Sequence, residues 1–173
     1  ENDALYPLDG QQRLTTLWLL HWYIALKSDN LSANKDIFNC FTYETRISSR
    51  EFCNHLCTID SNNYKNFKDK NKEKGIVEYI RNQTWFYQRY AQDPTVQGML
   101  RTLGGTKIED STGNDIKDGL EEIFGKDTDF QKCWSLLTSE ECPIVFVYKE
   151  MKDENLPLSD DLYVKMNARG KQL

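Results

Sequence analysis

The chain has 173 residues, of which 28% are charged, 39% hydrophobic and 12% aromatic, values typical of a globular protein rather than a disordered one. Its formal net charge of −5 supplies no overall positive field for a nucleic-acid backbone, which disfavours direct DNA binding by this segment alone and leaves only a local basic site as an alternative. No apolar run approaches the roughly 18 residues of a membrane span, and five cysteines, an odd number, are typical of reduced thiols in the cytoplasm.

The first predicted elements are a short strand and a long helix. Residues Leu5 to Leu8 are predicted as a strand, which Pro7 restricts to an edge, and Gly10 then permits a sharp turn. From Gln11 onward, apolar residues recur at helical spacing and cover nearly the whole circumference. We therefore expect a buried helix that ends near Ser28.

The next segment combines a strand-like stretch with a helix. Residues Ile37 to Tyr43 are rich in β-forming side chains and predict a strand. Ser48 followed by Glu51 is a capping-box pattern, which predicts a helix from about residue 50 to residue 57. From residue 60 to residue 75, lysines alternate with amides and acids, which indicates a solvated loop or weak helix, with a basic contact patch as the alternative.

Helices dominate the prediction for the second half of the chain. The aromatic-rich segment 76–90 is predicted as an amphipathic helix, and Asp93 or Thr95 can cap a further helix that ends at Gly104-Gly105. A surface loop is expected from Glu109 to Asp115. Further elements are predicted downstream, namely short helices over residues 116–124, 130–137 and 161–167 and a buried strand over residues 143–151.

The cluster Asp9-Gly10-Gln11-Gln12-Arg13 lies where the first strand is expected to lead into the first helix. The first N–H groups of a helix have no internal acceptors and carry the positive end of the helix dipole, which suits a phosphate. Gly10 would allow close approach of the backbone, Arg13 could clamp phosphate oxygens, and Asp9 could hold a divalent metal or orient water. The amides of Gln11 and Gln12 could position a water or contact a base. The alternative is that Asp9 only caps the helix and Arg13 pairs with a surface acid.

A second polar cluster, from Tyr163 to Lys171, gathers cations around the end of the last predicted helix. By one interpretation, Lys165 and Arg169 complement the helix dipole and Gly170 ends the helix. By the other, Arg169 and Lys171 face an anion. The residues alone favour the first interpretation.

Two other candidate sites have less support. Cys53 and Cys57 lie one helical turn apart, but no Cys-x2-Cys pair or defined fourth ligand accompanies them, which favours buried free thiols over a zinc site. The aromatic residues between Trp85 and Tyr90 could stack on nucleobases, but their helical spacing favours core packing.

Two stretches of the chain resemble the N-terminal domain of GmrSD-type restriction endonucleases, which belongs to the ParB/sulfiredoxin-like superfamily: residues 8–17 (LDGQQRLTTL) and residues 166–173 (MNARGKQL). The intervening stretches YETRISSREFC and WFYQRYAQDPTVQGML resemble one large subgroup of these proteins. The resemblance therefore spans nearly the whole chain.

This resemblance implies an α+β, mainly helical fold in which a small ParB/sulfiredoxin-like sheet carries the DGQQR turn beside a helical subdomain. It implies one domain over residues 1–173, with the nucleotide site in about residues 1–60 and 140–173 and the helical part in about residues 76–137. We expect a preceding segment that completes the pocket and a following HNH-like nuclease domain, both outside this sequence. By position, the implied site residues are Asp9, Gln11, Gln12 and Arg13 for catalysis, Gly10, Arg13, Asn167 and Arg169 for nucleotide binding, and Asp9 for the metal.

The function that the resemblance implies is binding and hydrolysis of a nucleoside triphosphate with Mg²⁺, as part of a bacterial anti-phage, modification-dependent DNA restriction protein in the cytoplasm. Its partners would be the nucleotide and, through the nuclease domain, DNA. No membrane association is expected, and an oligomer is possible. Two alternatives remain: a nucleotide sensor that does not hydrolyse, and a DNA- or protein-binding regulatory module on a ParB-like scaffold.

Overall fold

The computed structural model describes residues 10–109 and 115–146. These residues fold mainly into α-helices joined by short turns. The elements are α1 (Gln11–Lys27), the 3-10 helix η1 (Ser32–Asn34), α2 (Lys35–Asn39), α3 (Ile47–Leu56), α4 (Ser61–Lys70), α5 (Ile76–Arg81), α6 (Gln88–Gln92), α7 (Pro94–Gly104), β1 (Lys107–Glu109), β2 (Asp115–Lys117), α8 (Leu120–Ile123) and α9 (Phe130–Leu137).

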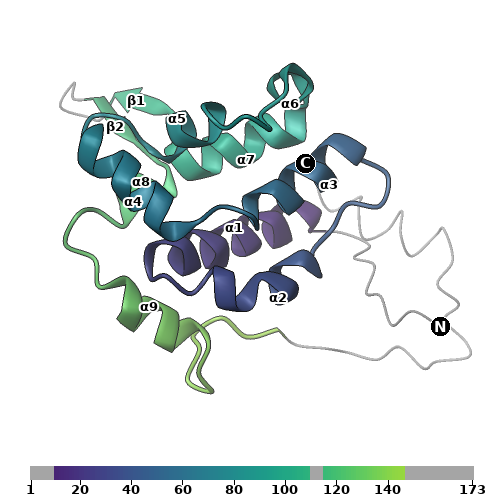
Figure 1. The fold of residues 1–173 in the computed structure, drawn as a ribbon. Coiled ribbons are helices and arrows are strands. Elements are labelled where there is room, and N and C mark those ends of the chain that lie inside the picture. The colour runs from purple at the N-terminus through teal and green to yellow at the C-terminus, as the bar shows by residue number, and fades with distance from the viewer. Residues whose placement is uncertain (1–9, 110–114, 147–173) are drawn as a thin grey trace, which may run out of the picture.

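Helix α1 runs through the middle of the molecule, with α7 on one side and α2 and α9 on the other (Figure 1). Leu19, Trp22 and Leu26 of this helix are completely buried. The indole N–H of Trp22 donates to the carbonyl of Leu56 in α3 at 3.0 Å, so the ring is buried without leaving its donor unpaired. The prediction of a helix that ends near Ser28 is confirmed, and the predicted burial holds for residues 18–27, whereas most side chains of residues 11–16 are exposed.

The predicted α+β fold with a ParB-like sheet is wrong. Within the described residues, strands occur only in the short antiparallel hairpin of β1 and β2, in which Ile108 lies opposite Ile116. This hairpin lies at the end of the molecule away from the first turn of α1 (Figure 1). In the described part of the chain, α1 packs against the helices α7 and α9, whose apolar faces cover its buried residues. The strand predicted over residues 5–8 lies outside the described residues.

The strand predicted from Ile37 to Tyr43 is also wrong, because this segment contains helix α2 followed by turns. Phe38 is buried against Trp18 in an edge-on contact with ring centroids 6.0 Å apart, whereas Ile37 is 71% exposed. The carbonyl of Phe38 accepts the indole N–H of Trp18 at 3.1 Å. Tertiary contacts of one side chain therefore override the β-propensity of the stretch.

Helix α3 forms where a helix was predicted, but its start differs. The helix begins at Ile47 with Arg46 in the N-cap position, so Ser48 lies inside the first turn and the predicted capping box is absent. Glu51 instead forms an ion pair with Arg89 of α6. The following lysine-rich segment forms helix α4, which Asp60 caps by accepting a hydrogen bond from the backbone N–H of Asn63 at 2.8 Å.

The helix predicted over residues 76–90 is divided into α5 and α6 by a series of turns. This interruption brings Trp85 and Phe86 against Phe52 of α3, with ring centroids 6.1 and 6.4 Å apart. Trp85 also stacks on His55, with centroids 4.8 Å apart and an angle of 9° between the planes. These contacts agree with the prediction that the aromatic residues between Trp85 and Tyr90 pack in the core rather than stack on nucleobases. Trp85 and Phe86, however, lie in the turns between α5 and α6 and not on one continuous helix.

The predicted ends of later helices are largely confirmed. The Asp93 side chain caps α7, which ends at Gly105 with a positive φ of 76°, and α9 spans the predicted residues. The helix predicted over residues 116–124 is wrong in its first half, because residues 115–117 form β2. Gly119 packs so closely on the backbone of Gly105 that a side chain would clash, and α8 begins only after this contact.

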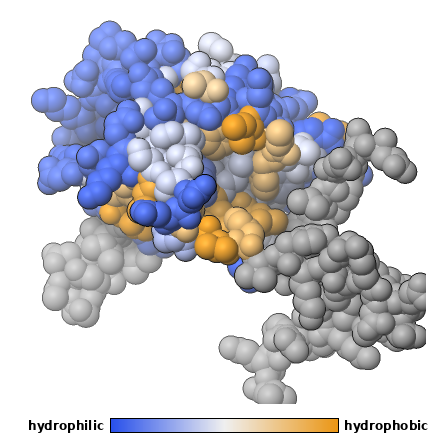
Figure 2. All heavy atoms as spheres, turned by 90° about the horizontal axis from the view of Figure 1, so that it is seen from below, coloured by the Kyte–Doolittle hydropathy of each residue, from blue (hydrophilic) through white to orange (hydrophobic). Residues whose placement is uncertain are grey.

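Apolar side chains are exposed on the face formed by α2 and α9, which Figure 2 shows from below. They include Ile37 on α2, Leu136 on α9, and Val145 and Phe146 beyond it. Residues 143–146 form no strand, and the rest of the strand predicted over 143–151 and the helix predicted over 161–167 lie outside the described residues. None of the described helices is long and apolar enough to cross a membrane. The predicted division into a nucleotide-site part and a helical part stays a prediction.

Candidate functional site

The first turn of α1 has the backbone geometry expected for an anion site. Gly10 precedes the helix with φ 82° and ψ 15°, a left-handed conformation that glycine adopts without strain. It offers no side chain to cap the helix, and no acidic residue lies in the first turn. Within a helix, the first backbone N–H groups have no acceptor and point outward together with the positive end of the dipole. The predicted sharp turn at Gly10 is therefore confirmed.

The Arg13 side chain folds back over this turn. A Cβ atom added to Gly10 would lie 3.2 Å from Nη2 and 3.4 Å from Nε of Arg13. The guanidinium therefore lies against the glycine at the start of the helix, where it adds positive charge to that of the helix dipole. The structure thus brings two of the predicted residues, Gly10 and Arg13, into contact.

The predicted glutamines lie on a different side of the same turn, at a cleft of about 470 Å³ between α1 and α7. This volume is within the range of small-molecule sites. The cleft is lined by Gln11, Gln12, Thr15 and Thr16 of α1, Tyr43 and Arg46 of the segment before α3, and Pro94, Thr95, Gly98, Met99 and Thr102 of α7. In the described part of the chain, its walls thus combine amides, hydroxyl groups and the cation Arg46 with a few apolar surfaces.

Three helices begin around this cleft. Helices α1, α3 and α7 run in similar directions with their N-termini at the same end of the molecule (Figure 1). Arg46 at the N-cap of α3 donates from Nη1 to Oγ1 of Thr95 in the first turn of α7 at 2.8 Å. Asp93 accepts the backbone N–H of Thr95 at 2.8 Å and the hydroxyl of Ser49 in α3 at 3.3 Å. The starts of α3 and α7 are therefore held together by side-chain hydrogen bonds.

Tyr43 connects this arrangement to α1. Its hydroxyl lies 2.5 Å from Oγ1 of Thr15, which also donates to the carbonyl of Gln11 at 2.8 Å. Burial raises the pKa of the Tyr43 phenol, and the hydrogen bond with Thr15 opposes this only in part. Tyr43 therefore stays protonated at neutral pH and contributes a neutral hydrogen-bonding group to the cleft.

The remaining predicted site residues, Asp9, Asn167 and Arg169, lie outside the described residues. Their roles in metal or nucleotide binding stay predictions. In the described part of the chain, no group of three or more His, Cys, Asp or Glu residues is arranged to hold a metal ion. Cys53 and Cys57 are buried thiols, and burial raises the pKa of both.

Sequence reasoning missed Tyr43, Arg46 and Thr95 as site residues. They lie about thirty to eighty residues from the DGQQR cluster in the chain, and only the packing of α1 against α7 brings them to it. The stretch YETRISSREFC, which contains Tyr43 and Arg46, resembles one large subgroup of the GmrSD proteins, but the resemblance assigns no role to either residue. No local pattern distinguishes this arginine from any other arginine that precedes a helix.

Comparison with known protein families matches residues 1–173 to the N-terminal domain of the GmrSD restriction endonucleases. The chain belongs to this family. Membership confirms the resemblance seen in the DGQQR and Asn-Ala-Arg-Gly stretches and makes the chain part of a restriction endonuclease. No curated protein and no solved structure matches the chain significantly.

Proposed function

We propose that this GmrSD domain binds and hydrolyses a nucleoside triphosphate, with the phosphates at the first turn of α1. The observation that supports this most directly is the left-handed Gly10 at the start of α1, against which the Arg13 guanidinium is folded. Backbone amides and a guanidinium are the groups that hold phosphate oxygens in proteins. Family membership adds the context of DNA restriction, in which nucleotide hydrolysis would control cleavage of DNA by an attached nuclease domain.

In the proposed mechanism, the amides of the first turn and Arg13 hold the phosphates and stabilise the charge that develops during phosphoryl transfer. Gln11 or Gln12 orients the attacking water, since both line the cleft beside that turn. Asp9 directly precedes Gly10 and supplies the carboxylate oxygen that Mg²⁺ prefers. When bound, Mg²⁺ would neutralise charge on the phosphate oxygens.

A second candidate function is a nucleotide sensor without turnover. The described lining of the cleft offers amides, hydroxyl groups and Arg46, but no histidine, lysine or carboxylate that could act as a general base. Such a site would bind a triphosphate and change the state of an attached nuclease without consuming the ligand. A DNA- or protein-binding module is the third alternative.

The test is to measure nucleotide binding and phosphate release by the full-length protein, comparing wild type with Arg13→Gln. Loss of a charge-assisted contact costs about 1.5–3 kcal/mol, so nucleotide affinity or turnover should fall roughly tenfold to a hundredfold. Arg81→Gln is the matched control, because Arg81 is an exposed arginine on α5 outside the cleft.

The outcomes separate the candidates. Turnover that is unaffected by Arg13→Gln rejects the proposed mechanism. Binding without phosphate release in wild type supports the sensor. Binding of DNA but of no nucleotide supports the third alternative.

A further inference from the structure

Among the described residues that line the α1–α7 cleft, Arg46 is the one charged side chain. It is exposed, and its Nη1 donates to Oγ1 of Thr95 at 2.8 Å. A guanidinium carries several N–H donors, so this contact occupies only part of its capacity. Within the described residues, no carboxylate lies close enough to Arg46 to form an ion pair. Arg46 therefore presents a positive charge to the cleft that is not taken up by an ion pair with a described residue.

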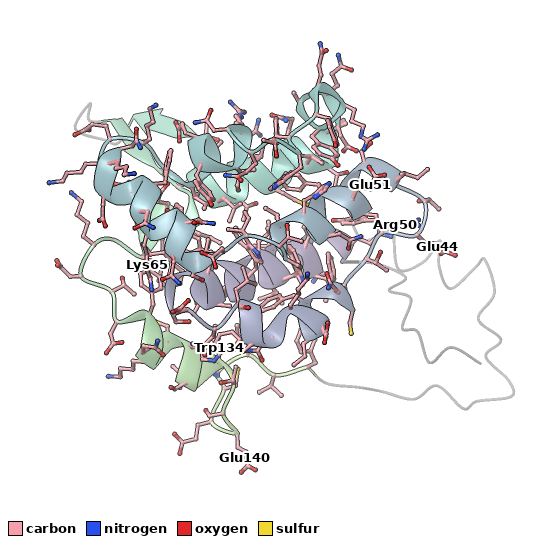
Figure 3. The ribbon with its side chains drawn as sticks, viewed as in Figure 1. Glu44, Arg50, Glu51, Lys65, Trp134 and Glu140 are labelled. Atoms are coloured by element: carbon pink, nitrogen blue, oxygen red, sulfur yellow. The ribbon has the colours of Figure 1, made fainter. Side chains whose placement is uncertain are left out.

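The backbone that carries Arg46 is held in place from two sides. Arg50 of α3 donates from Nε to the carbonyl of Tyr43 at 2.7 Å and from Nη2 to the carbonyl of Glu44. Figure 3 shows Arg50 and Glu44 beside the start of α3. Tyr43 in turn bonds Thr15 of α1. A cation on such a fixed segment loses little conformational entropy when it binds a ligand, which favours tight and specific contacts.

The polar groups around Arg46 also suit an anionic small molecule. Among the described residues, no acidic residue lines the cleft, and the nearby carboxylate of Asp93 accepts the N–H groups of Thr95 and Val96 and the hydroxyl of Ser49. Gln11 and Gln12 of the first turn of α1 line the same cleft as Arg46, so a ligand at that turn that extends into the cleft would come near Arg46. Arg13 is not among the described lining residues, so Arg46 is the cation that the described part of the chain places at this space.

We propose that Arg46 binds the phosphate chain of the nucleoside triphosphate from the α7 side of the cleft, as a second phosphate-binding cation outside the DGQQR stretch. This inference rests on the proposed nucleotide site and adds a residue and a direction to it: the phosphates lie between the start of α1 and the start of α3. Thr95 positions the guanidinium through its hydroxyl group.

The experiment measures binding of fluorescently labelled ATP and GTP to the full-length protein, and of adenosine and guanosine by calorimetry. The variants are Arg46→Gln, Thr95→Val and, as a matched control, Arg81→Gln. Arg46→Gln should weaken triphosphate binding about tenfold or more while changing nucleoside binding little, because only the triphosphate carries the anion. Thr95→Val, which removes the hydrogen bond but keeps the cation, should weaken triphosphate binding only a few-fold. Arg81→Gln should match wild type.

Several results would overturn the inference. If wild type binds triphosphate and Arg46→Gln binds it equally well, Arg46 is not a phosphate ligand, and the proposed function stands without it. An equal loss of triphosphate and nucleoside binding would assign Arg46 a structural role only. If Arg46→Gln weakens binding of a short DNA duplex but not of nucleotide, the phosphate that it contacts belongs to DNA. Absence of nucleotide binding in wild type would overturn both proposals.

Discussion

Asp93 joins the starts of two helices at the cleft, and we expect Asp93→Ala to destabilise the fold by about 2 kcal/mol. Its carboxylate caps α7 by accepting the backbone N–H groups of Thr95 and Val96 at 2.8 and 3.2 Å. Loss of such a cap costs about 1 kcal/mol. The hydroxyl of Ser49, which is completely buried, donates to the same carboxylate at 3.3 Å and would lose its partner. An unpaired buried hydroxyl costs about 1 kcal/mol more, at the low end of the usual range because this bond is long.

Thermal unfolding followed by circular dichroism measures this effect, since 1 kcal/mol corresponds to about 2–4 °C in Tm for a chain of this size. Asp93→Ala should therefore lower Tm by about 4–8 °C. Asp60→Ala is the matched control, because Asp60 caps α4 through one amide and is exposed, so only the cap is lost. Adding Ser49→Ala to Asp93→Ala should recover part of the loss, since it removes the orphaned hydroxyl. A Tm shift no larger than that of Asp60→Ala would refute the reasoning.

Two further predictions concern side chains away from the cleft. Burial beside Trp85 lowers the pKa of His55, so its stabilising contribution is complete above the ordinary value of 6.5 and is lost as the pH falls below it. As the pH is lowered from about 7.5 to about 5.5, Tm should fall more steeply in wild type than in His55→Phe, because phenylalanine keeps a stacked ring but does not titrate. Equal slopes of Tm against pH in the two proteins would contradict this prediction. Burial raises the pKa of the Cys53 thiol, and it raises the pKa of the Cys57 thiol to about 11. A thiol reagent should therefore label the exposed Cys40 in the native protein and should reach Cys53 and Cys57 only after unfolding. Mass spectrometry of the labelled peptides checks this, and rapid native labelling of Cys53 would show that α3 opens.

Local signals in the sequence were sufficient for several elements. The Asp93-Pro94 pair predicted the start of α7, and the Gly104-Gly105 pair its end, because capping and left-handed backbone are properties of a few adjacent residues. The same kind of signal failed at Ser48, where the pattern of a capping box is present but the helix begins earlier. A cap pattern shows where a helix can begin, and the packing of its apolar face decides where it does.

The sequence alone determined that residues from Gln11 onward form a buried helix entered through a left-handed glycine, because both follow from side-chain periodicity and from the absence of a Cβ atom at Gly10. It also determined the family, through the DGQQR stretch and its distant Asn-Ala-Arg-Gly partner. Helical periodicity also places Gln11 and Arg13, two residues apart, on different sides of the helix start. Only the tertiary structure decided that the side with Gln11 faces a cleft against α7, and that Arg46 reaches the same cleft. Contacts between distant segments arise from how the helices pack, and no window of neighbouring residues records that packing.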